Sequence, residues 1–130
     1  MIIEIDTLSL SPIYEQLRDQ MVLGIASKQL SPGEALPSVR RLAADLGINF
    51  HTVNKSYTML CDEGYIVMDR RKGAVVAQSL KSGEEFISRL SQKLLLNAAE
   101  AVCHKTGKKE FIALCAAQYE NAMGRKNEGG

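Results

Sequence analysis

The sequence predicts a mostly α-helical fold with a small β-hairpin, and three observations lead to this class. Apolar residues recur at helical spacing in two short segments between residues 38 and 64. A glycine-containing turn separates the two segments. Two short β-type runs follow directly and flank a basic tip that contains a glycine. Two helices, a tight turn and a hairpin in this order are typical of a winged helix-turn-helix fold.

The first predicted helix starts at Ser11-Pro12, because a proline in the first helical turn loses no hydrogen bond. Its apolar stripe has i, i+4 spacing and consists of Ile13, Leu17, Met21 and Ile25. The helix is expected to end near Gln29 and to complete a three-helix core, since the motif alone buries too little apolar area. Ahead of it, residues 1–5 suggest a short strand.

The two helices of the motif have recognisable ends. Ser38 can cap the first of them, because its hydroxyl can accept a hydrogen bond from a free N–H of the first turn. Gly47 can end that helix in the left-handed conformation. Asn49 is expected to cap the second helix, and Gly64 to close it.

The second helix of the motif has two different faces. Its apolar face, which can pack onto the domain, carries Val53, Tyr57 and Leu60. Its polar face, which can point into a groove of DNA, carries His51, Asn54, Lys55 and Thr58. The hairpin that follows has strands over residues 66–68 and 74–77, with Arg70, Arg71, Lys72 and Gly73 at its tip.

Residues 12–77 resemble the DNA-binding domain of the GntR family of bacterial transcription regulators. The matching stretches are PIYEQL at 12–17, LxPGExLPSVR at 30–40, LAADLGIN at 42–49, TV at 52–53 and EGYI at 63–66. The opening PIYEQL and the short tail are most similar to the YtrA subfamily. The chain departs from the family at Phe50 and His51, where proline and a polar residue are usual, and in a wing that reads RKGAVV rather than GxGTFV. We therefore expect it to read a different base sequence from the family's common operator.

The resemblance implies a set of DNA-contacting residues. They are Ser38, Arg40, Asn49, Phe50, His51, Thr52, Asn54 and Lys55 in the two helices, and Arg70, Arg71, Lys72 and Gly73 in the wing. Arg40 matches the family's arginine that reaches a guanine, where it can donate two hydrogen bonds; the alternative is a phosphate contact. Phe50 either contacts a thymine methyl group or packs under the turn. The wing either enters or lines a minor groove, or is a solvated tip.

Net charge identifies no partner, because 16 basic residues stand against 15 acidic ones. Between residues 36 and 77 the basic residues are in modest excess, and they gather on the expected DNA face. The chain has no polybasic tail, so DNA binding must depend on where these charges are placed.

The chain is expected to divide into a DNA-binding domain over residues 1–78 and a helical tail over residues 79–130. Ser82 to Glu85 fit a capping box at the start of a long helix, Thr106-Gly107 break it, and residues 108–123 form a last helix. Two helices cannot enclose a core, so their apolar residues pack either onto the domain or onto a second copy. Regulators of this kind bind their operators as two-fold dimers, which favours packing onto a second copy. The YtrA resemblance implies the same. The predicted dimerisation residues are Phe86, Leu90, Leu94, Phe111, Cys115 and Tyr119.

The remaining side chains indicate no cofactor and no metal. Cys61, Cys103 and Cys115 are expected to be small buried hydrophobic residues rather than disulfide partners, and the alternative is a role in redox or metal sensing. Adjacent residues on a helix point about 100° apart, so Cys103 and His104 are poorly placed to share a metal. No apolar run approaches the ~20 residues of a membrane span and no signal peptide is visible, so we expect a cytoplasmic protein.

We expect a DNA-binding transcription regulator and not an enzyme, since the sequence has no phosphate-binding loop, nucleophile elbow or dinucleotide fingerprint. It is expected to bind an inverted-repeat operator in double-stranded DNA as a homodimer. The resemblance implies repression, often of a transporter operon and of the regulator's own gene. A small-molecule effector remains open, because no residue set identifies one. The alternative is a winged-helix module for protein or RNA contacts, and the base-edge donors Arg40, His51 and Asn54 favour DNA over it.

Overall fold

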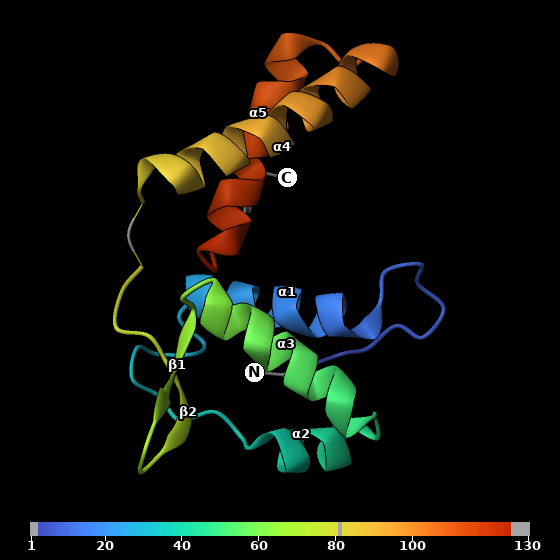
Figure 1. The fold of residues 1–130 in the computed structure, drawn as a ribbon. Helices are drawn as coiled ribbons and strands as arrows, with labels where there is room; N and C mark the ends of the chain where they lie inside the picture. The colour runs from blue at the N-terminus through green and yellow to red at the C-terminus, as the bar shows by residue number, and fades with distance from the viewer. Residues whose placement is uncertain (1–2, 81, 126–130) are drawn as a thin grey trace. The chain divides into compact units, whose positions relative to one another are not determined.

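The computed structural model describes residues 3–80 and 82–125, and these fall into two compact units that divide near Leu80. The first unit contains α1 (Ile13–Ala26), α2 (Val39–Leu46), α3 (Phe50–Asp62), β1 (Ile66–Asp69) and β2 (Gly73–Val76) (Figure 1). The second contains α4 (Glu84–Cys103) and α5 (Lys108–Ala122). The fold is mostly α-helical with a two-stranded antiparallel wing, as the sequence predicts.

The core of the first unit lies between α3 and its two neighbours, α1 and α2. The most deeply buried apolar side chains from the helices are Leu17 and Met21 of α1 and Val53 and Leu60 of α3. Burying each such side chain contributes roughly 1.5–3 kcal/mol. The buried Ser56 hydroxyl donates to the backbone oxygen of Tyr14 at 2.7 Å, so this polar group joins α3 to α1 without an unsatisfied donor.

The ends of the motif helices are as predicted. The Ser38 hydroxyl accepts a hydrogen bond from the Arg41 N–H at 3.1 Å, and the Asn49 side chain accepts one from the His51 N–H at 2.7 Å. Gly47 ends α2 with φ 66°, in the left-handed region that glycine adopts at little cost. These caps hold α2 and α3 in register on either side of a short turn.

The wing pairs β1 with β2 in antiparallel register, with Ile66 opposite Val76 and Asp69 opposite Gly73. A further segment lies beside β2 that the sequence did not indicate. Ala35 forms an isolated bridge with Val75, and the Leu36 N–H donates to the Ala74 oxygen at 2.8 Å. The chain between α1 and α2 therefore braces the inner strand of the wing.

The expected strand at the N-terminus is wrong for residues 3–5, and residues 1–2 lie outside the described residues. Two glutamine side chains of α1 take the place of a partner strand. Gln20 Oε1 accepts from the Glu4 N–H at 2.8 Å, and Gln16 Oε1 accepts from the Asp6 N–H at 2.9 Å. Because Gln16 and Gln20 are four residues apart, both amides reach the same extended segment.

Three predicted helix ends also differ. α1 begins after Pro12, which occupies the N-cap position, and it ends at Ala26, ahead of Gln29. The capping box at Ser82 is wrong, because Gly83 is the N-cap of α4 and no side chain caps that helix. Ser82 therefore lies one residue too early to reach the free N–H groups of the first turn.

In the second unit, neither α4 nor α5 has a buried residue. Leu94 is 42% exposed and Tyr119 is 69% exposed. Thr106-Gly107 separate the helices as expected, and Gly107 is the N-cap of α5. The described part of the tail therefore has an apolar surface but no core of its own.

Candidate nucleic-acid interface

The turn between α2 and α3 brings together the first residues of both helices. Arg40 lies in the first turn of α2, and its guanidinium carbon is 5.5 Å from the centroid of the Phe50 ring at the start of α3. The Phe50 and His51 rings meet edge-on, with centroids 5.6 Å apart and planes at 83°. Arg40, Phe50 and His51 are all exposed, so they form one continuous surface across the two helices.

The face of α3 that points away from the core is polar, as predicted. His51, Asn54, Lys55 and Thr58 are exposed, whereas Thr52 is half-buried. Asn54 and His51 can present hydrogen-bonding groups to base edges, and the N-terminus of α3 presents the positive end of the helix dipole to an anion. This face therefore has the chemistry needed to read a duplex.

Lys55 occupies the flank of α3 that faces α1. Its ammonium nitrogen is 3.9 Å from the centroid of the Tyr14 ring, a distance at which a cation is attracted to the ring face. Lys55 remains exposed, so its charge is available to a phosphate. The contact fixes that charge at the α1 side of α3, whereas Arg40 lies at the α2 side.

The wing tip is organised by a carboxylate. Asp69 Oδ1 accepts hydrogen bonds from the backbone N–H groups of Arg71 at 2.8 Å and Lys72 at 3.0 Å. These bonds favour the ionised carboxylate, so they lower the pKa of Asp69. Gly73 follows with φ 77° and allows the chain to enter β2. The three cations of the tip, Arg70, Arg71 and Lys72, are all exposed.

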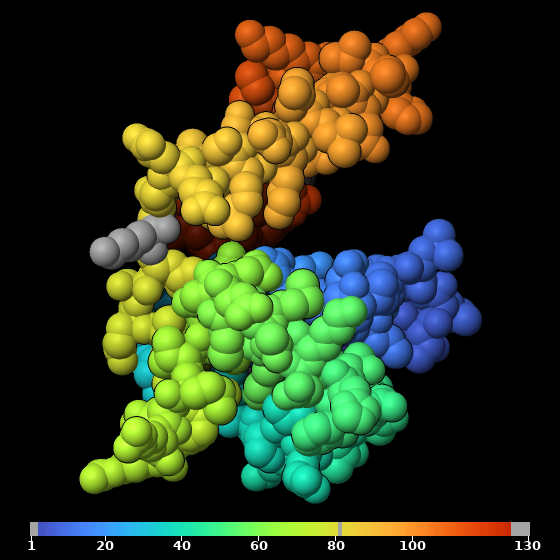
Figure 2. Space-filling view, in the orientation of Figure 1, coloured from blue at the N-terminus to red at the C-terminus, as the bar shows by residue number. Residues whose placement is uncertain are grey.

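Figure 2 shows the wing as a projection at the lower edge of the first unit, on the same edge as α2. The wing and α2 lie at separate places along this edge. An elongated ligand with regularly spaced charges could touch both at once. Double-stranded DNA has this form.

Tyr57 connects the two helices from inside. Its hydroxyl donates to the backbone oxygen of Pro37 at 2.7 Å, one residue before the N-cap of α2. Burial raises the pKa of Tyr57 to about 12. The bond fixes the start of α2, and hence Arg40, relative to α3.

Sequence reasoning missed Tyr14, Asp69 and the hydrogen bond of Tyr57. A signal for Asp69 was available, because an aspartate two or three residues before N–H groups of a glycine-containing tip is typical of an Asx turn. The contacts of Tyr14 and Tyr57 join elements that are distant in the sequence, so no local pattern predicts them.

The cysteine expectation needs correction. Cys61 is half-buried, but Cys103 and Cys115 are exposed, so these two are not buried hydrophobic residues within the described chain. Their helices enclose no core that could cover them. Burial and the charge of Asp62 raise the pKa of the Cys61 thiol, which makes it a poor nucleophile.

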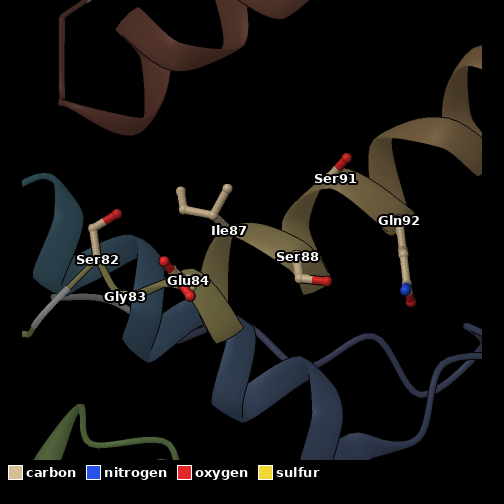
Figure 3. A pocket seen from close by; sticks show the side chains of 7 residues that line it. All are labelled: Ser82, Gly83, Glu84, Ile87, Ser88, Ser91 and Gln92. Atoms are coloured by element: carbon tan, nitrogen blue, oxygen red, sulfur yellow. The ribbon is translucent and has the colours of Figure 1, made fainter.

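The structure contains an open hollow along one side of the start of α4, and it is shown in Figure 3. Its lining residues are Ser82, Gly83, Glu84, Ile87, Ser88, Ser91 and Gln92. Nothing in this set identifies a ligand. Among the described residues, no three His, Cys, Asp or Glu side chains are grouped to hold a metal. Nor do those residues include a helix long and apolar enough to cross a membrane.

The predicted dimerisation residues lie on the two tail helices. Phe86, Leu90 and Leu94 follow α4 at four-residue spacing, and each is about 40% exposed. On α5, Phe111 is half-buried, whereas Cys115 and Tyr119 are exposed. Apolar side chains at these exposures remain available to another surface.

The chain is similar to known bacterial regulators. The family described as "Bacterial regulatory proteins, gntR family" matches residues 12–76. The HTH-type transcriptional repressor YtrA of Bacillus subtilis is 40% identical over 80 residues, which are 62% of this chain and 62% of that protein. The match therefore spans less than two thirds of that relative.

Two solved structures have a similar fold. YtrA from Sulfolobus acidocaldarius, described as a GntR-family transcription factor, is 40% identical with a TM-score of 0.64, covering 78% of this chain and 99% of that one. A transcriptional antiterminator from Listeria monocytogenes is 25% identical with a TM-score of 0.89, covering 100% of this chain and 98% of that one. The second similarity extends through the tail helices.

Proposed function

The chain belongs to the GntR family and is a DNA-binding transcriptional regulator with a YtrA-like architecture, and from this premise we propose that it is a homodimeric repressor. We propose that it binds an inverted-repeat operator. The DNA-binding domain would span residues 1–78 and the dimerisation tail residues 79–130. Its relatives and fold neighbours are transcription regulators rather than enzymes.

One observation carries the proposal: the exposed face of α3 begins beside Arg40 and lies on the same unit as a cationic wing. The expected contacts with bases come from Arg40, His51 and Asn54. The expected contacts with phosphates come from the capped end of α3, from Lys55 and from the wing cations. A positioned base reader with phosphate anchors on either side fits a duplex better than a protein partner.

The exposed apolar side chains of the tail support the homodimer. They have no core in the described residues of the second unit, and pairing with a second copy would bury them. A two-fold dimer then requires two half-sites in inverted orientation, about one or two helical turns apart. Each half-site alone would be bound much more weakly, because the second contact becomes intramolecular in the dimer.

Repression is proposed because the B. subtilis relative is described as a repressor. The proposed targets, a transporter operon and the regulator's own gene, follow the habit of the family. Any small-molecule effector would act on the tail or between protomers. It would be detected as a compound that changes DNA binding, since no described residue set identifies it.

A mobility-shift assay with the full chain tests the proposed function. The probe is the DNA upstream of the chain's own gene, and the control is an unrelated duplex of the same length and base composition. The proposal predicts a shift of the upstream DNA at protein concentrations that leave the control unshifted. Equal shifts of both duplexes, or tighter binding of a matched RNA, would instead support a winged-helix module without operator recognition.

A further inference from the structure

Arg40 and Phe50 are in contact across the turn, although they belong to different helices. We propose that Phe50 is a positioning residue for Arg40, and that its ring holds the guanidinium in the orientation that reads a base. This inference rests on the proposed function, because it assumes that Arg40 contacts a base. It assigns Phe50 neither of the two roles that the sequence suggested.

The geometry separates Arg40 from the arginine next to it. The Arg40 guanidinium lies over the Phe50 ring, whereas Arg41 Nε lies 3.8 Å from Asp45 Oδ2, one turn along α2. Arg41 is therefore paired along its own helix. Only Arg40 is directed across the turn toward α3.

The Phe50 ring is itself fixed on its own helix. The His51 ring meets it edge-on at 5.6 Å, and Asn49 caps the helix immediately before it. Arg40, Ala43 and Phe50 also line a hollow between α2 and α3. Of these three, Ala43 is buried, whereas Arg40 and Phe50 are exposed.

Phe50 does not fit the role of a core residue. Its side chain is 39% exposed and is absent from the apolar core formed by its neighbours on α3, Val53 and Tyr57. Its ring instead meets the exposed side chains of Arg40 and His51, both of which lie on the expected DNA face.

Positioning matters because an unrestrained arginine side chain loses rotamer freedom when its guanidinium donates two hydrogen bonds to a base. An aromatic ring that restricts the guanidinium beforehand reduces that loss. A cation–π contact at an exposed site changes an equilibrium constant by roughly two- to fivefold. This range sets the expected effect of removing the ring.

The test uses the full chain and two variants of similar size, Phe50→Leu and Phe50→Tyr. The probe is the duplex that the unmodified chain selects from a random library. The Arg40→Ala variant first identifies the base pair at which discrimination is lost. The reference is then the same duplex with a different base pair at that position. We expect Phe50→Leu to reduce discrimination at that base pair roughly two- to fivefold, and Phe50→Tyr, which keeps the ring, to retain it. In an Arg40→Ala background, Phe50→Leu should have no further effect there.

Other outcomes overturn the inference. Loss of discrimination at a different base pair, independent of Arg40, would show that Phe50 contacts a base directly. Equal weakening on all duplexes would show a general structural role, and unchanged discrimination would show no role. If the unmodified chain selects no sequence at all, both the proposed function and this inference fail. If it selects a sequence and Phe50→Leu discriminates normally, only the inference fails.

Discussion

We expect the reading of bases in the operator to depend most on Arg40. Arg40→Ala should remove discrimination of about 1–3 kcal/mol at one base pair, because two hydrogen bonds to guanine are lost. The affinity for random duplex should fall less. Fluorescence anisotropy with the selected duplex and a scrambled one measures both effects.

The neighbouring Arg41 provides the matched control for this change. It is 78% exposed and is paired with Asp45, so Arg41→Ala should weaken both duplexes by a similar factor. If Arg40→Ala also weakens both duplexes equally, Arg40 is a phosphate anchor and does not read a base.

Tyr57 should give the domain a measurable pH dependence. The pKa of Tyr57 is about 12 in the folded protein, above the value of about 10 for an unfolded tyrosine. The contribution of Tyr57 to the free energy of unfolding is therefore complete below pH 10 and is lost as the pH rises toward 12. Tyr57→Phe should lower the free energy of unfolding by about 1 kcal/mol at pH 8, because the hydrogen bond to Pro37 is lost.

The comparison at two pH values tests the cause. At pH 11 the titration of Tyr57 should have lowered the free energy of unfolding of the wild type by about 1 kcal/mol. The phenylalanine variant has no group to titrate at this position, so it should show no such loss. Urea denaturation should therefore show the two proteins closer in stability at pH 11 than at pH 8. A constant difference at both pH values would mean that Tyr57 does not titrate as its burial implies.

Individual residues could be predicted where their partners are close in the sequence. Ser38 and Asn49 cap their helices as expected, because a cap bonds to an N–H group only two or three residues away. The contact of Arg40 with Phe50 was missed, because it depends on how α2 and α3 pack across the turn.

At the scale of elements, the wing should act through its charge. Replacing Arg71 and Lys72 with glutamine should reduce the slope of log affinity against log salt by one to two units, at about 0.9 per phosphate contact. Both side chains are exposed, and only their backbone N–H groups bond to Asp69, so the turn should survive. The measurement is anisotropy over a salt series, and an unchanged slope would mean that the wing stays off the DNA.

Periodicity and turn residues predicted the helices and the wing in the right order, but they also predicted a strand that does not form and missed a bridge to the wing. Residues 3–5 form no strand, because Gln16 and Gln20 satisfy that backbone from α1. The bridge between Ala35 and Val75 was also missed. In both cases the partner comes from elsewhere in the fold, which a local pattern does not contain.

For the whole molecule, the tail should decide the oligomeric state. A chain truncated after Leu80 keeps every residue of the core, so it should fold as a monomer and bind the operator poorly. Light scattering and anisotropy on the full and truncated chains measure the two effects. A full chain that is monomeric both free and on DNA would mean that the tail does not pair.

The apolar positions of the tail could be predicted from the sequence, whereas their partner could not. Phe86, Leu90 and Leu94 have helical spacing and remain partly exposed, as unpaired apolar residues would. Pairing joins two chains, so a pattern within one chain leaves both dimerisation and packing onto the domain as options.

Selection of duplexes from a random library by the full chain is the most direct test of the central claim, that α2, α3 and the wing read an operator as a two-fold dimer. We expect an enriched inverted repeat with half-sites about one or two helical turns apart. We also expect Arg40→Ala to flatten the base preference at one position in each half-site. A library from which no sequence is enriched, or only a single unrepeated site, would contradict it.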